Sequence, residues 1–553
     1  MRKTVIVLVC CTATLLTAYT GYRGYKVWKR DHMMSLARQF AAKSDARNTL
    51  LSLQQVLRSD PRNIEGARMM AQLMEAARSP SALLWRSRVV ELNPHSLDDR
   101  LALAQTALIF GDYASATNAL EGVEAAGRKT ATYHNIAGAV ASTANLRAEA
   151  EAHFLEAARL EPTNLVPQLN LAVVCLHGTN ALAMADARAS LARISSHPAF
   201  RCKALRELVV DALDCRQTND ALALSRDLVQ EPSSTFSDRL LRLDVLKATQ
   251  DPQFKGTLAA DQREAGTNTA KLYELSLWQM NRMGPEDTLV WLQSLPRNLQ
   301  TTQPAALLAA ECHSGLEDWR GLSGSLTNQN WGELEFLRHA FLARAMRGQD
   351  LGLASKEEWE LALRAANGQK ASLVMLLHRA AQWKWQSEGE DLLWTIVNQN
   401  PGETWAVQTL GQILYSEGRT RSLMMFYCQE LKRSPADLAL KNNVAITALL
   451  LEAGELKPHE LAREVYQLAP TNASYASTYA YSLLLQQKGA EALKVIEKLK
   501  PQELAHPAIA GYYAIILRAN GNPAKAKTYL ELSSKARLLP EEQKLFENAK
   551  SGA

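Results

Sequence analysis

Two consecutive 34-residue segments decide the fold, because they carry one pattern in the same register. Residues 97–130 read LDDRLALAQTALIFGDYASATNALEGVEAAGRKT, and residues 131–164 read ATYHNIAGAVASTANLRAEAEAHFLEAARLEPTN. Five positions recur 34 residues later: Leu103 as Ala137, Ala104 as Gly138, Gly111 as Asn145, Ala116 as Ala150, and Leu120 as Phe154. A period of this length, with small residues at fixed places, indicates stacked structural units rather than a single core.

Each segment predicts two antiparallel helices joined by a turn. In the first copy, Ala104 belongs to the first helix, the turn follows at Gly111, and the second helix carries Ala116 and Leu120 at helical spacing. We expect Ala104 and Ala116 to be small because the two helices approach closely there. Leu120 would fill the gap toward the next hairpin. In the second copy, Pro162 ends the helix because it cannot continue the hydrogen-bond ladder.

The small, bulky and proline positions of these segments resemble the tetratricopeptide repeat, although His134 and Ala141 replace the tryptophan and first tyrosine of that family. The resemblance implies an all-α fold, an α-solenoid of antiparallel helical hairpins. It also implies a concave face, lined by the first helix of each hairpin, that holds a protein or peptide ligand. The resemblance places six candidate partner-binding residues on that face: Gln105, Asn135, Gln408, Gln412, Tyr415 and Tyr481. Their amides could bind a peptide backbone and their rings supply contact area; the alternative is that they are only solvated.

Composition agrees with a helical array. The chain of 553 residues is too long for one ordinary core, and its 27 glycines and 19 prolines are fewer than the usual share of about 12%. The formal net charge of +5, spread over interleaved acidic and basic residues, does not indicate nucleic-acid binding. The seven cysteines are scattered and form no C-x-x-C motif, which argues against a disulfide framework or a zinc site.

Residues 1–29 predict a membrane anchor. The uncharged stretch from Thr4 to Thr20 is long enough to cross a bilayer, and an aromatic and basic flank follows it up to Arg30. A cleaved signal peptide is the alternative, although Thr17-Ala18-Tyr19 is a poor cleavage site. The basic residues on both sides do not settle the orientation. We expect a single-pass anchor with a body facing the periplasm of a bacterial envelope.

The rest of the chain divides into three segments. Residues 30–198 read as five hairpin units, and residues 401–553 as a second array that ends in a capping helix. Between them, residues 199–400 keep helical periodicity but lose the register. Nine of the eleven tryptophans lie between Trp278 and Trp405, so this middle segment either fills its core with large rings or lines a groove for a peptide or glycan.

No motif for chemistry is complete. The histidine and glutamate at His459-Glu460 begin like a zinc-protease helix, but Arg463 stands where the second histidine is required. Gly321 and Gly324 lack the lysine of a phosphate-binding loop. We therefore expect no enzyme activity, no cofactor, no metal and no catalytic residue.

Three functions follow from the pattern as hypotheses. The first is a membrane-anchored scaffold that recruits protein partners, since tethering raises their local concentration. The second is an accessory protein for envelope polysaccharide or secretion assembly, which would bind a glycan or an extended peptide through the tryptophan-rich middle. The third is an enzyme with an unrecognised site. The repeat itself does not choose among them, because a fold does not determine function.

Overall fold

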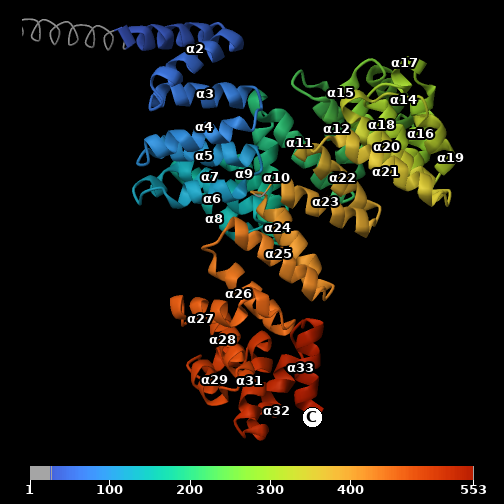
Figure 1. The fold of residues 1–553 in the computed structure, drawn as a ribbon. Helices are drawn as coiled ribbons and strands as arrows, with labels where there is room; N and C mark the ends of the chain where they lie inside the picture. The colour runs from blue at the N-terminus through green and yellow to red at the C-terminus, as the bar shows by residue number, and fades with distance from the viewer. Residues whose placement is uncertain (1–24, 27, 401, 552–553) are drawn as a thin grey trace, which may run out of the picture. The chain divides into compact units, whose positions relative to one another are not determined.

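The computed structural model describes residues 25–26, 28–400 and 402–551, and all regular structure in these ranges is helical. Successive helices lie side by side in antiparallel pairs, as Figure 1 shows for the first and the second part of the chain. The described chain forms two compact units, the first ending at Trp278 and the second beginning at Gln279. The division falls within the middle segment, 199–400, that the sequence set apart.

The first unit begins with a helix over residues 28–42 and continues as helix pairs. Its further helices are α2 (Ala46–Ser59), α3 (Ile64–Ala76), α4 (Ser81–Leu92), α5 (Leu97–Ile109), α6 (Tyr113–Glu121), α7 (Ala131–Thr143), α8 (Arg147–Leu160), α9 (Leu165–Leu176), α10 (Ala181–Ile194), α11 (Pro198–Asp214), α12 (Thr218–Gln230), α13 (Phe236–Ala248), α14 (Phe254–Ala265) and α15 (Thr269–Arg282), the last containing the division between the units.

The second unit continues the pairs and ends in a single helix. Its helices are α16 (Pro285–Ser294), α17 (Arg297–Gln300), α18 (Ala305–Gly315), α19 (Trp319–Leu326), α20 (Glu335–Gly348), α21 (Gly352–Ala366), α22 (Lys370–Gln382), α23 (Gln386–Gln399), α24 (Thr404–Ser416), α25 (Thr420–Arg433), α26 (Leu438–Leu450), α27 (Pro458–Leu468), α28 (Ala473–Leu485), α29 (Gly489–Ile496), α30 (Pro501–Leu504), α31 (Pro507–Ala519), α32 (Pro523–Ser533) and α33 (Pro540–Ser551).

A left-handed residue marks the turn inside nearly every hairpin. The N–H of the following residue donates to the carbonyl five residues back, as in Asp112 to Ala107 and Leu146 to Ala141, both 2.9 Å, which is the closing bond of a Schellman turn. These residues recur every 33 to 35 positions, apart from longer intervals after Asn145 and after Gln250: Ser44, Arg78, Gly111, Asn145, Arg216, Gln250, Glu317, Asp350, Lys384, Gly418, Glu452, Gln487 and Gly521. Gly284 also has a positive φ, but Pro285 follows it and has no N–H to donate. The backbone period therefore continues through residues 199–400, where the residue pattern of the repeat cannot be followed in the sequence.

The predicted close approach of paired helices is confirmed. Ala104 and Ala116 have no exposed surface, and neither has Ala150 in the next hairpin. A Cβ on Gly138 would lie 2.8 Å from the ring of Phe154, so the larger ring of the second copy requires the smaller residue opposite it. The first helices of successive hairpins also pack on one another, α5 on α7 and α7 on α9. The prediction of an all-α solenoid of antiparallel hairpins is confirmed.

The predicted membrane anchor falls on residues that the structure does not describe. The apolar stretch at 4–20 lies outside the described ranges, and within those ranges no helix combines the length and the apolar character needed to span a bilayer. At the other end, α33 packs on α31 and α32 and buries Phe546, as expected of a capping helix.

Candidate functional site

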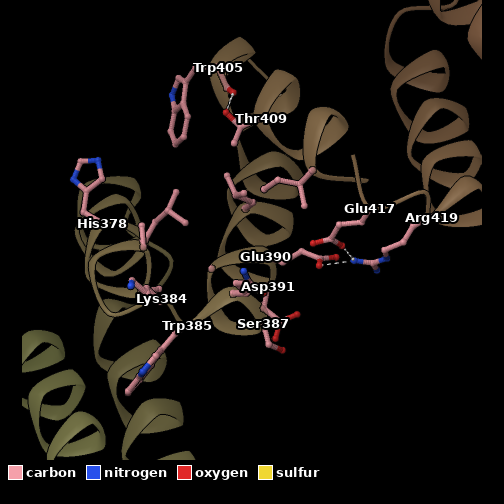
Figure 2. A pocket seen from close by; sticks show the side chains of 17 residues that line it. His378, Lys384, Trp385, Ser387, Glu390, Asp391, Trp405, Thr409, Glu417 and Arg419 are labelled. Carbon is pink, nitrogen blue, oxygen red and sulfur yellow. Dashed lines mark hydrogen bonds and ion pairs between the residues drawn. The ribbon is translucent and has the colours of Figure 1, made fainter. Parts of the chain in front are cut away.

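An open cavity of about 990 Å³ lies among helices α22, α23 and α24 of the second unit. Figure 2 shows Trp405 and His378 toward one end of this cavity and Trp385 toward the other. Five aliphatic residues form the apolar part of its wall: Leu377, Ala380, Ala381, Leu393 and Ile413. An apolar hollow with a few polar groups at its edge is the usual form of a ligand site.

Two features of this joint accompany the cavity. The helices α20 and α22 pack directly, as do α26 and α28, whereas α22 and α24 are connected mainly through α23 and through the ion pair of Lys370 with Glu403 at 2.6 Å. In addition, the paired small positions held by Ala104 and Ala116 in the first unit are here Leu377 and Gly389. A Cβ on Gly389 would meet the nearest Leu377 atom only at 3.9 Å, an ordinary contact distance. The absent side chain therefore leaves free space beside Leu377.

Two tryptophans of different exposure line the cavity. Trp405 on α24 is 39% exposed, and its indole N–H donates to the Glu403 carboxylate at 2.8 Å. Trp385 is 7% exposed, and the Arg347 guanidinium lies 3.7 Å from the centre of its ring. Covering an exposed aromatic ring beside an apolar surface lowers the free energy. Trp405 is therefore the side chain that a ligand would bury.

The neighbouring Trp383 belongs to the core. It is 8% exposed, and its ring centre lies 5.1 Å from that of Trp385 and 5.4 Å from that of Phe341. Trp385 also packs edge-on against Trp359, with ring centres 5.4 Å apart. Core filling, one of the two roles open for the tryptophan-rich segment, thus describes Trp383 and most of the Trp385 surface.

The edge of the cavity carries charges of both signs. The Arg419 guanidinium donates to the Glu390 carboxylate at 2.5 Å and to Glu417 at 3.3 Å, as the dashed lines in Figure 2 show. The hydrogen bond to Glu390 raises the pKa of Arg419. By contrast, the Lys384 ammonium forms no ion pair with any residue in the described part of the chain. Lys384 is therefore the cation at this edge that can pair with a ligand carboxylate.

The side chains around the cavity are suited to binding a ligand. No group of three or more histidine, cysteine or acidic side chains in the described ranges is placed to hold a metal ion. The acidic side chains Glu390 and Glu417 at the cavity both accept hydrogen bonds from Arg419. What the cavity offers is apolar surface, one exposed indole and the unpaired Lys384 ammonium, with the Asp391 carboxylate also in its lining. The indole and the ammonium recognise an apolar anchor next to an acid.

The six predicted contact residues lie elsewhere. Gln105 on α5 is exposed, and Asn135 on α7 accepts a hydrogen bond of 2.9 Å from Asn170 on α9, so it links two successive hairpins. Gln408 and Gln412 are exposed on α24, and each directly precedes a cavity-lining residue, Thr409 and Ile413 respectively.

The two tyrosines differ from each other. Tyr415, 36% exposed, donates from its hydroxyl to the Arg537 carbonyl oxygen at 2.6 Å. Tyr481 is 5% exposed, and its ring centre lies 5.1 Å from that of Tyr512. Burial raises the pKa of Tyr481 to about 12. The expectation of an exposed Tyr481 is wrong, because α31 covers this side chain.

None of the six residues lines the cavity, and sequence reasoning missed those that do. Trp405, Thr409 and Ile413 follow one another at intervals of four on α24, a pattern that could have marked one face of this helix. Gly389, at the position held by Ala116 and Ala150 in the two hairpins of residues 97–164, was the second signal. Neither of these two sequence signals reveals that α22 and α24 are connected mainly through α23.

Comparisons with known proteins add little to this description. No protein-family model matches the sequence, and no curated protein is significantly similar to it. Two solved structures align over most of the chain. The crystal structure of the APC/C hetero-tetramer Cut9-Hcn1 is 13% identical, with 94% of this chain and 96% of that chain covered and a TM-score of 0.26. The structure of Naa15/Naa10 bound to HypK-THB is 12% identical, with 95% and 78% covered and a TM-score of 0.29. At these scores neither likeness bears on fold or function, and the solenoid is assigned from the turns and packed helix pairs.

Proposed function

We propose that this protein is a non-enzymatic scaffold that binds a peptide segment of a partner protein in the cavity among α22, α23 and α24. The observation that carries the proposal is the 39% exposed Trp405 beside an apolar cavity of about 990 Å³. Repeat arrays of this kind present extended surfaces and need no catalytic group to act. The cavity is also large enough for one or two side chains of a peptide.

The charges at the cavity edge define the chemistry of the peptide. Arg419 is already neutralised by Glu390 and Glu417, whereas Lys384 is available. A peptide with an aromatic or branched aliphatic residue next to an aspartate or glutamate would cover Trp405 and pair with Lys384 at the same time. Such a short contact gives modest affinity, since immobilising the peptide offsets much of the gain.

Tethering to a membrane would compensate for modest affinity. The apolar stretch at residues 4–20 supports a single-pass anchor that holds the scaffold near its partners and raises their effective concentration. We propose a periplasm-facing body on the exported-anchor pattern. A reporter that is active only in the periplasm, fused after Ala553, tests this orientation. Activity of the reporter supports it, and inactivity contradicts it.

A display selection tests the peptide site. A random library of 12-residue peptides is selected on the full-length protein in detergent, and binders are measured against wild type, Trp405→Ala and Tyr113→Ala. Tyr113, 51% exposed on α6 of the first unit, is the control. We expect enriched sequences with an apolar residue beside an acid, whose affinity falls at least about tenfold with Trp405→Ala, in line with a binding hot spot.

Two results would contradict the proposal. One is a selection without enrichment, or one whose binders lose as much affinity with Tyr113→Ala as with Trp405→Ala. The other is binding of glycans: an array signal lost with Trp405→Ala, in the absence of peptide binders, would assign the cavity to a carbohydrate. The same Trp405 variant thus distinguishes the two ligand classes.

A further inference from the structure

The chain returns to itself at the C-terminal end of the second unit. Between α32 and α33, residues 537–539 are neither helix nor turn, and they cross the junction of α24 and α25. Tyr415 and Arg537, which meet there, are 122 positions apart in the chain. A contact of this range is unusual in a solenoid, where each hairpin normally touches only its neighbours.

Two hydrogen bonds to main-chain carbonyl oxygens join the junction and the returning segment. The Tyr415 hydroxyl donates to the Arg537 carbonyl oxygen at 2.6 Å, and the Arg537 guanidinium donates to the Ser416 carbonyl oxygen at 2.7 Å. Bonds from groove side chains to ligand backbone are the means by which protein grooves hold extended peptides. Arg537 itself is exposed, so its role is this bond rather than core packing.

Apolar residues of the segment enter the junction as anchors. Leu539 is 4% exposed and belongs to the same buried cluster as Leu410 and Leu414 of α24. Pro540 lies against Gly418, where an added Cβ would stand 3.0 Å from two ring carbons of the proline. Gly418 also has a φ of +66°, so a glycine serves both the turn and the close approach.

Two acids complete the contact. The Thr420 hydroxyl donates to the Glu541 carboxylate, and the Tyr512 hydroxyl donates to Glu542 at 2.5 Å. The Glu542 carboxylate also accepts a hydrogen bond of 2.9 Å from the Leu539 N–H, directly before α33 begins at Pro540. Each residue from Arg537 to Glu542, except the half-buried Leu538, thus contacts a specific partner. Binding at this junction therefore depends on the side chains of the segment as well as on its main chain.

We infer that the surface formed by the end of α24, the start of α25 and α31 is a binding site for a peptide of the order basic, leucine, leucine, proline, acid, acid, irregular over its first three residues and helical from the proline, and that residues 537–542 occupy it in cis. This site is separate from the proposed cavity among α22, α23 and α24, and does not depend on it. A partner carrying a segment of this chemistry must displace the chain's own segment to bind.

Competition between the two segments provides the test. The probe is a fluorescein-labelled synthetic peptide of residues 534–545, titrated in fluorescence anisotropy onto the full-length chain and onto its double variant Arg537→Ala, Leu539→Ala. Because the internal segment is present at an effective concentration of about millimolar, we expect wild type to bind at least about tenfold more weakly than the variant. A peptide in which Leu539 is replaced by aspartate should bind neither.

A third substitution separates binding from folding. Added to the double variant, Tyr415→Phe removes one hydrogen bond to the peptide backbone and should weaken the peptide about fivefold, as one net hydrogen bond predicts. Tyr273→Phe, at a tyrosine 45% exposed on α15, should have no effect. Circular dichroism is used to check that each variant is folded.

The inference fails if the folded double variant does not bind the peptide, or if it binds no more tightly than wild type. It also fails if Tyr415→Phe and Tyr273→Phe behave alike. A wild-type mass of two chains in light scattering, returning to one chain in the double variant, would show exchange between copies and would overturn occupancy in cis.

Discussion

The two units share one backbone repeat but close their hairpin joints with different chemistry. In the first unit, forked arginine–carboxylate pairs join the first helices of successive hairpins: Arg38 with Glu65, Arg68 with Asp99, and Arg206 with Asp238. The second unit also has ion pairs between hairpins, such as Lys370 with Glu403 and Arg347 with Glu388, but it adds clusters of packed rings. Phe341 of α20 meets Trp383 at the end of α22, and Trp359 meets Trp385. A 34-residue turn period therefore fixes the hairpins, while the filling of the joints is free to vary, and in the second unit one joint is left open.

The largest expected effect is the loss of a ring from the second unit. Trp383→Ala removes an 8% exposed indole that contacts Phe341 and Trp385, and should lower the free energy of unfolding by about 3–5 kcal/mol. Thermal unfolding measures the change, with Tyr113→Ala at the 51% exposed Tyr113 as control. Equal effects of the two substitutions would show that ring packing does not hold this unit.

Breaking a clamp of the first unit should cost less. Asp238 is 1% exposed and accepts both guanidinium bonds from Arg206, at 2.6 and 3.0 Å, while Arg206 keeps access to water. Asp238→Asn should lower stability by about 1–3 kcal/mol. Glu65→Gln, at a clamp exposed on both sides, should cost under about 1 kcal/mol and is the matched control.

The Asp238 clamp also predicts a pH dependence. Burial opposes the charged carboxylate, but hydrogen bonds from Arg206 and Thr235 outweigh it and lower the pKa of Asp238. Its stabilisation is therefore complete above the unfolded-state value of about 3.9 and is lost as the pH falls through the lower folded-state pKa. The stability gap between wild type and Asp238→Asn should narrow below about pH 4 in urea titrations. A gap that stays constant would contradict the clamp.

Filling the open joint should stabilise the chain slightly. Gly389→Ala adds a helix-favouring methyl group with room of 3.8 Å to the nearest atom, and should raise stability by about 0.5–1 kcal/mol. The substitution should also lower the affinity of peptides selected for the cavity, because the added methyl group takes up part of the cavity. Gly324→Ala on α19, where a Cβ meets nothing within 4 Å, should give the helix gain without the change in affinity.

The smallest effect concerns the end of the chain. Burial raises the pKa of Glu542, so its stabilising contribution is complete at low pH and is lost as the pH rises through the raised folded-state pKa. Glu542→Gln should therefore raise the urea midpoint slightly at pH 7 and leave it unchanged near pH 4. The titratable groups that face this carboxyl are Tyr415, Tyr481, Tyr512 and Glu541. A lower midpoint at pH 7 would contradict the assignment.

The hairpins could be predicted from the sequence because their rules are local. Ala104, Ala116 and Ala150 recur at fixed intervals, and each is buried where a close helix contact requires a small side chain. The register over 199–400 was missed because the turn is a backbone property: Arg216 and Lys384 take the left-handed conformation that Gly111 announces by its residue type.

The candidate sites could not be predicted in the same way, because both depend on contacts between distant positions. The cavity requires the divergence of α22 from α24 as well as Gly389, and no residue spacing encodes this divergence. The burial of Tyr481 depends on Tyr512 in the next hairpin, and the role of Tyr415 on a segment more than a hundred residues later. A repeat pattern predicts neighbours, and these contacts go beyond it.

Hydrogen–deuterium exchange tests the central claim most directly. The full-length protein is compared with and without a display-selected peptide at saturating concentration. The account predicts slower exchange over residues 377–419, which contain the cavity wall, and unchanged exchange in α5 and α7 of the first unit. Protection confined to the first unit, with none over 377–419, would contradict it.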